Sequence, residues 1–244
     1  MRVLRCRARA GELGTRWREG NRLPSFFAHR DGERAVIAGG DARHLARSLR
    51  ARIGEEIEVV DPAGLLLTVR LDIVSSERVE GVVVSERAHQ PEPAARITIA
   101  IANLPAPALE LVLSRCTEAG AFAFHVIQAD RSVARGAKPE RWSTICREAA
   151  MLAGRLRVPA VAGPSSLEAV LKAHAHPVML VRGAPRRLAD LRTPQDLALL
   201  VGPEGGWSDR ELALVGVKAG LGPRNLRADT ASLFALATAL SARE

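Results

Sequence analysis

The sequence predicts an α/β protein in which a small antiparallel β-sheet or barrel precedes a larger domain with a parallel sheet. β-Branched runs separated by turn sequences fill the first third of the chain, and continuous apolar runs alternate with helical patterns in the remainder. Between the two parts, the segment SERAHQPEPAA at residues 85–95 contains two prolines and several polar residues, as a linker does. We therefore expect domains at residues 21–90 and 91–244, preceded by a basic extension over residues 1–20.

The first domain is expected to contain one helix and three strands. The helix covers residues 42–52, with Asp41 as its N-cap and Gly54 at its end. The β-branched runs that predict the strands are separated by the turn sequences DPAG and SSER. They cover residues 57–60, 65–74 and 79–84.

The second domain is predicted to contain buried parallel strands, since apolar runs without alternation are typical of strands covered on both faces. These runs cover residues 97–101, 124–127, 178–181 and 197–201. Three helix starts are marked: Ser165 with Glu168 and Ser208 with Glu211 fit the S-x-x-E capping box, and Pro139 suits a first helical turn.

The charge of the chain favours a polyanionic partner. Lys and Arg total 35 against 27 Asp and Glu, which gives a net charge of +8. Only Lys138, Lys172 and Lys218 are lysines, so the cations are mostly arginines, whose planar fork binds phosphate bidentately. Nucleotide bias in the genome would produce the same excess of arginine without a functional cause.

Several function classes are disfavoured by the composition. The three cysteines lie far apart, without a CxxC or a His at ligand spacing, so neither a disulfide framework nor a metal site is expected. No apolar run reaches the length of about 18 residues that crosses a bilayer, and the first residues lack the apolar region of a signal peptide. The expected location is cytoplasmic.

A glycine-rich loop is the first candidate for a binding site. In LLVGPEGGWSDRE, residues 199–211, a buried strand leads through Gly202, Gly205 and Gly206 into a helix capped by Ser208. Glycines let a ligand approach the backbone, whose free N–H groups bind polar or anionic groups. The loop is neither GxGxxG nor a P-loop, so dinucleotide and triphosphate sites are weakly supported. An ordinary strand-to-helix turn would have the same glycines.

Two basic segments are further candidates. LGPRNLRADTA, residues 221–231, precedes a final apolar helix expected over residues 230–242, for which Asp229 or Thr230 is the N-cap. ADRSVAR, residues 129–135, follows a predicted strand, so its polar side chains lie on the ligand-binding edge if that strand is parallel. Both segments are equally compatible with solvated basic loops.

Taken together, these segments resemble one family. GPEGGWSDRE, LGPRNLRADTA, DRSVAR and ERWSTICREAAMLAGRLRVPAV look like the signature blocks, in order, of the RsmE family, the ribosomal RNA small subunit methyltransferase E enzymes. RLPSFFA and ARHLARSLRARIGEEIEVVDPAG are similar to its N-terminal RNA-binding domain, so the resemblance covers about residues 21–244.

The resemblance implies a PUA-like β-barrel followed by a SPOUT-type α/β methyltransferase domain with a C-terminal trefoil knot. It also implies a homodimer that uses S-adenosyl-L-methionine to methylate N3 of a uridine in 16S rRNA, within or outside the assembled small subunit. The implied cofactor-binding residues are Gly202, Glu204, Gly205, Gly206, Leu221, Gly222, Leu226 and Arg227. The implied RNA-binding residues are Arg22, Arg47, Arg131, Ser132, Arg155 and Arg157.

The chemistry assigns Arg131 and Arg227 an electrostatic role in catalysis. Uracil N3 is nucleophilic only after it loses its proton, and the resulting charge spreads onto O2 and O4, where a guanidinium stabilises it. Glu204 and Asp229 are expected to hydrogen-bond to the cofactor or a helix N-terminus rather than to act as general base. No metal is required.

Two departures from the family pattern keep other functions open. NLPAPALE, beginning at Asn103, replaces a stretch that usually contains a lysine, and Met151 with Leu152 replaces polar residues. The alternatives are a SPOUT methyltransferase with another RNA target and a non-catalytic RNA-binding factor in ribosome assembly.

The final helix is a candidate dimer contact. Its apolar side chains Leu233, Phe234, Ala237 and Leu240 recur at helical spacing. Burial in the core of one subunit would explain the same pattern.

Overall fold

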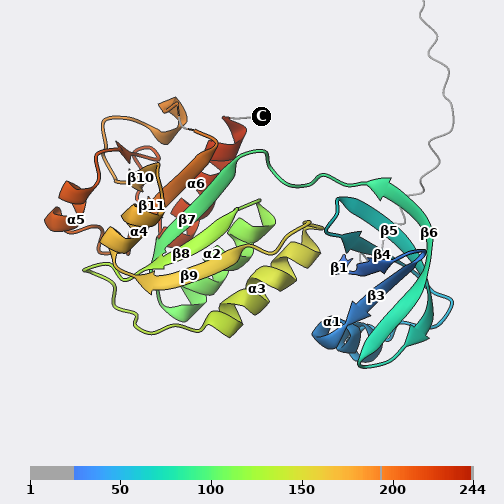
Figure 1. Ribbon diagram of the computed structural model, residues 1–244. Helices are drawn as coiled ribbons and strands as arrows, with labels where there is room; N and C mark the ends of the chain where they lie inside the picture. Colours follow the sequence, from blue (N-terminus) through green and yellow to red (C-terminus); the bar gives the residue numbers. More distant parts are fainter. Residues whose placement is uncertain (1–24, 193, 243–244) are drawn as a thin grey trace, which may run out of the picture.

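The computed structural model, which describes residues 25–192 and 194–242, contains two six-stranded sheets joined by a short linker (Figure 1). The basic extension and Arg22 lie outside the described residues. The strands of the first sheet follow the order β1-β4-β5-β6-β3-β2. Their bounds are Phe26–Phe27 (β1), His29–Asp31 (β2), Arg34–Ala38 (β3), Glu56–Asp61 (β4), Leu65–Val74 (β5) and Arg78–Ala88 (β6).

The first sheet is curled into a half-barrel whose inner face is apolar (Figure 1). Its pairs are antiparallel except for β1, which runs parallel to β4. The predicted runs become β4, β5 and β6, but β6 continues to Ala88, so SERA is strand rather than linker. The linker between the two sheets is therefore confined to residues 89–95.

The predicted helix of the first domain begins earlier and is less regular than expected. Helix α1 (Gly39–Arg43) continues directly into a π-helical turn over His44–Ser48. Ala38, the last residue of β3, is the N-cap, and the prediction that Asp41 caps this helix is wrong. Because the chain turns out of the strand at Gly39, whose φ is +66°, Asp41 already lies in the first helical turn. Its carboxylate instead pairs with Arg147 of the second domain.

The second sheet is entirely parallel, which confirms the predicted α/β class. Its order is β12-β10-β11-β7-β8-β9. The strands are Arg96–Ala102 (β7), Ala123–Ile127 (β8), Ala160–Ser165 (β9), Pro177–Leu180 (β10), Asp196–Val201 (β11) and Lys218–Ala219 (β12). Edge strands β9 and β12 were not predicted, because β9 is largely exposed and β12 has only two residues. The central strand β7 has buried side chains at every position after Arg96.

Helices α2 and α6 pack against each other, and α6 also packs on β7 and β11 (Figure 1). The helices are Ala106–Glu118 (α2), Pro139–Leu152 (α3), Leu167–Ala173 (α4), Asp209–Leu214 (α5) and Ala228–Ser241 (α6), with a 3₁₀ turn η2 at Leu188–Asp190. None of the helices in the described part of the chain is long and apolar enough to span a membrane.

In the second domain, the helix starts agree with the prediction at two of the four expected sites. Pro139 opens α3, and Ser208 with Glu211 forms the full capping box of α5. Helix α4 is instead capped by Ser166, because Ser165 still belongs to β9. Helix α6 starts with Arg227 at the N-cap and no side-chain cap, so the expected caps at Asp229 and Thr230 are wrong: both lie within the first turn.

The end of α3 joins the two domains. Met151 is buried in the apolar cluster of the first domain, and its carbonyl accepts a hydrogen bond from the Ser25 N–H at 3.0 Å. The ring Nε2 of His89 lies 2.6 Å from the Gly154 carbonyl oxygen. The position of the domains relative to each other therefore depends on residues at the end of α3 and directly after it. The numbered domain limits and the trefoil knot stay predictions.

Candidate functional site

A cavity of about 360 Å³ lies at the carboxyl ends of the strands β10, β11 and β12. Three loops enclose it, the first after Leu180, the second after Val201 and the third from Leu221 to Leu226. The first residues of α6, Ala228 and Ala231, close another side. Ligands of parallel α/β sheets bind at this edge, because strand ends and the loops between them converge there.

The predicted cofactor-binding residues lie together on the cavity wall, with one exception. Those that line it are Gly202, Glu204, Gly205, Gly206, Leu221, Gly222 and Leu226. Arg227 is exposed and does not line the cavity. The chain enters α6 at this residue, so Leu226 before it and Ala228 after it face the cavity instead. Neither the cofactor-binding nor the catalytic role predicted for Arg227 is supported by this position.

Glycines in these loops are needed for packing and for backbone conformation. A Cβ on Gly202 would lie 3.0 Å from the Cε2 atom of Trp207, so the indole packs directly on this glycine. Gly206 and Gly222 have φ values of +70° and +103°, which side chains other than glycine rarely adopt. The Trp207 Nε1–H donates to the Leu180 carbonyl at 3.1 Å and thereby joins the glycine-rich loop to the end of β10.

Sequence reasoning missed part of the cavity wall. The glycine-rich motif contains Trp207 and the basic segment 221–231 contains Arg224, but the sequence assigned neither residue a role. Arg182 gave no signal, because it follows β10 in a segment without a motif. Arg182 and Arg224 now add positive charge to the wall, and Glu204 is the only carboxylate lining the cavity among the described residues.

The cavity wall combines apolar side chains with charges of both signs. Leu180, Val181, Leu212, Leu221 and Leu226 supply the apolar surface. The glycine-rich loop adds backbone groups that can bond polar atoms. Such a wall suits a small ligand that has an apolar ring together with cationic and anionic groups.

Arg131, in the segment after β8, does not line the cavity but contacts the glycine-rich loop that does. Its guanidinium Nη1 donates to the Gly205 carbonyl at 2.9 Å, and a Cβ on Gly205 would lie 3.6 Å from the Arg131 Cβ. The side chain is otherwise exposed. The predicted catalytic residue Arg131 and the predicted cofactor loop are therefore in direct contact.

An ionic network fastens the same segment to α5. Asp130 Oδ1 accepts from Arg210 Nη2 at 2.7 Å, and Asp130 Oδ2 accepts from the Ser208 hydroxyl at 2.5 Å. These hydrogen bonds, first from Arg210 and then from Ser208, lower the pKa of Asp130. Arg210 also pairs with Glu168 of α4.

Among the described residues, the structure does not bring the other predicted RNA-binding residues to the cavity. Arg155 is 3% exposed, and its guanidinium is used by Glu92 and by the carbonyls of Thr117 and Ala121. This position does not support the predicted RNA-binding role, since a buried guanidinium with these partners has no free face for a phosphate. Ser132 is also 3% exposed, so its hydroxyl is not accessible to RNA.

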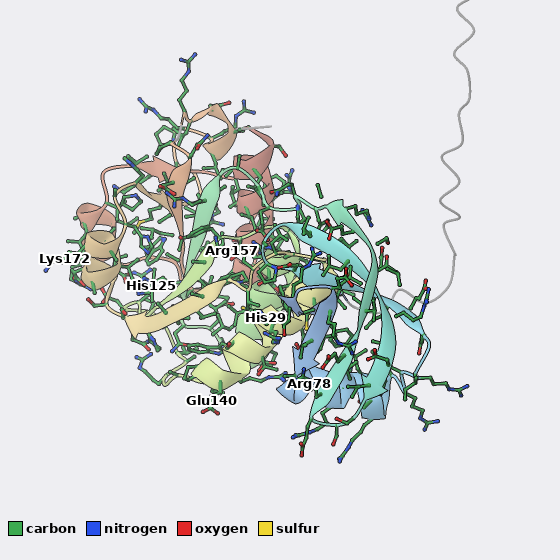
Figure 2. All side chains as sticks on the ribbon, turned by 45° about the vertical axis from the view of Figure 1, so that its right-hand side comes forward. His29, Arg78, His125, Glu140, Arg157 and Lys172 are labelled. Atoms are coloured by element: carbon green, nitrogen blue, oxygen red, sulfur yellow. The ribbon has the colours of Figure 1, made fainter. Side chains whose placement is uncertain are left out.

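Arg157 and Arg47 lie away from the cavity. Arg157, labelled in Figure 2, donates to the Phe122 carbonyl at 2.8 Å. Its guanidinium lies 3.7 Å from the centre of the Phe122 ring. Desolvation there lowers the pKa of Arg157. Phe122 precedes β8, whereas Arg131 follows it, so Arg157 lies at the opposite edge of the sheet. Arg47 is exposed in the π-helical turn of the first domain.

The chain is similar to a defined family of known proteins. Residues 90–240 match the family model of an RNA methyltransferase domain. The chain is 32% identical over 218 residues to the ribosomal RNA small subunit methyltransferase E of Synechocystis sp., covering 83% of this chain and 71% of the relative. It is 33% identical over 221 residues to the protein of the same name from Mycobacterium bovis, covering 83% and 84%.

A solved structure agrees with these relatives. The ribosomal RNA small subunit methyltransferase E of Neisseria gonorrhoeae, crystallised with S-adenosyl methionine bound, superimposes with a TM-score of 0.79 at 28% identity. The superposition covers 88% of this chain and 96% of that protein. Both domains therefore have counterparts in that structure.

Proposed function

Because the chain belongs to the ribosomal RNA small subunit methyltransferase E family, we propose that it transfers the methyl group of S-adenosylmethionine to a base of 16S rRNA. The observation that supports this best is the cavity formed by the glycine-rich loop, the loop after β12 and the start of α6. The relative from Neisseria gonorrhoeae has S-adenosyl methionine bound and superimposes along nearly its whole length.

The cavity residues fit this cofactor. Leu180, Leu221 and Leu226 would hold the adenine ring, and Glu204 supplies a negative charge to match the sulfonium. Arg182 and Arg224 would hold the carboxylate of the methionine part. The Gly202 contact with Trp207 leaves no room for a side chain on this wall.

Within this chain, the work of catalysis is orientation and stabilisation of charge. S-adenosylmethionine supplies a methyl group that its sulfonium already activates. Arg131 uses Nη1 to bond the Gly205 carbonyl, and its remaining N–H groups are available to a base held at the cavity rim. They would stabilise the charge that spreads onto the carbonyl oxygens when uridine N3 loses its proton. We propose N3 of a uridine as the acceptor on this basis.

Asn103 and Met151, one from each departure from the family pattern, have structural contacts outside the cavity. Asn103 is buried, and its amide nitrogen donates to the Gln128 side chain and to the Gly136 carbonyl, both at 3.2 Å. Met151 packs in the core of the first domain, as shown above. Neither residue lines the cavity. Enzymatic activity is therefore favoured over a purely RNA-binding role.

Methylation of ribosomal subunits tests the proposed function. Small subunits from a strain lacking this modification would be incubated with the protein and S-adenosylmethionine, and the modified nucleosides would be mapped by mass spectrometry. We expect one N3-methyluridine in 16S rRNA. A methyl group on a ribose or another base would identify a different RNA target, and the absence of both methylation and cofactor binding would favour the assembly factor.

A homodimer is the second part of the proposal. On α6, Leu233 and Phe234 are 37% and 44% exposed, and Ala237 is exposed beside them, whereas Leu240 is buried. The same helix lines the cavity through Ala228 and Ala231. An apolar helix face adjoining the cofactor cavity favours contact with a second copy that completes the RNA-binding surface.

A further inference from the structure

Glu211 is a buried carboxylate whose two oxygens bind the backbone of two different segments. The residue is 0% exposed, although it lies in the first turn of α5. Its Oε2 accepts a hydrogen bond from the Ser208 N–H at 2.8 Å, which completes the capping box. Its Oε1 accepts a second hydrogen bond, from the Asp130 N–H at 3.0 Å. A capping box requires only the first of these bonds, so the hydrogen bond from the Asp130 N–H is additional to helix capping.

The two backbone N–H groups belong to opposite sides of the candidate site. Ser208 ends the glycine-rich loop after β11, and Asp130 begins the segment after β8 that holds Arg131. In the sheet, β7 lies between β11 and β8. The Glu211 carboxylate therefore connects the two segments across the end of the central strand. The Arg131 bond to Gly205 is a parallel contact between the same segments.

We propose that Glu211 is a positioning residue, which holds Arg131 at the cavity rim by tying the backbone of Asp130 to the glycine-rich loop. The inference rests on the proposed function, because the position of Arg131 matters only if a base is presented at this rim. A cofactor that orders the glycine-rich loop would, through this carboxylate, also order the segment that holds Arg131. Cofactor binding and base orientation would thereby be coupled.

Substitution of Glu211 by glutamine tests the hydrogen bonds of the carboxylate while keeping the size of the side chain. Glutamine keeps the shape but replaces one acceptor oxygen by an NH₂ group, so one buried backbone N–H loses its partner. We expect kcat on 16S rRNA to fall by about tenfold to a hundredfold, the effect of leaving a buried donor unpaired. Cofactor affinity, measured by calorimetry, should change less than kcat. Asp209→Asn is the matched control: Asp209 lies in the same turn, is exposed and has no hydrogen-bond partner among the described residues.

A double-mutant cycle distinguishes positioning from a general structural role. If Glu211 acts through Arg131, then adding Glu211→Gln to Arg131→Ala should lower kcat little further, because the residue it positions is already gone. Fully additive losses would overturn the proposal. Hydrogen exchange provides an independent readout: S-adenosylmethionine should protect the amides of residues 130–132 in the wild type and not in Glu211→Gln.

Three further outcomes have distinct meanings. Should Glu211→Gln fail to fold, Glu211→Asp, which keeps the charge but shortens the reach toward the Asp130 N–H, replaces it in the same cycle, and additive losses again refute positioning. A wild-type protein that methylates RNA together with a Glu211→Gln variant that behaves like Asp209→Asn would refute the positioning role alone. A wild-type protein that neither binds S-adenosylmethionine nor methylates RNA would instead refute the proposed function.

Discussion

The absence of a side chain at Gly202 contributes to the shape of the candidate cofactor cavity. A Cβ there would lie 3.0 Å from the Trp207 ring, and the ring cannot retreat without stretching its bond to the Leu180 carbonyl. We expect Gly202→Ala to weaken S-adenosylmethionine binding by about tenfold, because the packed indole of Trp207 must move by a few tenths of an ångström to admit the methyl group. Calorimetry would measure this. Gly216→Ala, where an added Cβ meets open space, should bind like the wild type.

At Arg131, the expected loss is in turnover rather than in cofactor binding. Arg131→Ala removes the guanidinium at the rim, and we expect kcat on 16S rRNA to fall by about a hundredfold, as loss of an electrostatic donor typically causes. Cofactor affinity should fall less than about tenfold, because only one hydrogen bond, to the Gly205 carbonyl, is lost from the loop. Should the variant lose cofactor binding while its turnover on bound cofactor persists, the substrate role of Arg131 would be refuted.

At the scale of elements, the end of α3 determines how the two domains are held together. Arg155, three residues beyond the helix, binds Glu92 of the linker at 2.5 Å and also binds the carbonyls of Thr117 and Ala121. Arg147 on α3 pairs with Asp41 of α1 and lies over the Phe27 ring. Arg155, which the sequence suggested as an RNA contact, therefore connects the linker to the second domain.

Arg155→Ala should lower the free energy of unfolding by about 3 kcal/mol, since it removes a buried guanidinium that binds the Glu92 carboxylate and the carbonyls of Thr117 and Ala121. Urea unfolding followed by circular dichroism would measure the change. The matched control is Arg70→Ala, which breaks an exposed ion pair with Glu56 and should cost less than about 1 kcal/mol. Equal effects of the two substitutions would show that Arg155 contributes no more than a surface arginine.

At the scale of the whole molecule, the proposed homodimer can be tested by its mass in solution. We expect light scattering to give twice the chain mass of 26.2 kDa, and Phe234→Glu to give the monomer mass, because a charge on the exposed α6 face opposes apolar contact. Leu111→Glu, at a similarly exposed apolar position on α2, should leave the dimer intact. A wild-type monomer across micromolar concentrations would contradict the proposed homodimer.

The sequence by itself determined the class of the fold and the loops that form the cavity. Apolar runs without alternation predicted the inner strands of the parallel sheet, because strands covered on both faces need apolar side chains throughout. The walls of the cavity come from contiguous glycine-rich segments, so Gly202 and Gly222 could be found from local pattern and family resemblance. The edge strands β9 and β12 had no such signal, because exposure and shortness remove the apolar run.

Only the tertiary structure decided which polar side chains face the site. The sequence alone does not distinguish Arg131 from Arg155 as RNA-binding candidates. In the structure, Arg131 contacts Gly205, whereas Arg155 is buried against Glu92, 63 residues away. Glu211 was expected only to cap a helix, and its second oxygen meets an N–H group 81 residues away. Burial and contacts between distant segments depend on how the chain packs, whereas local pattern reports only on neighbours in the sequence.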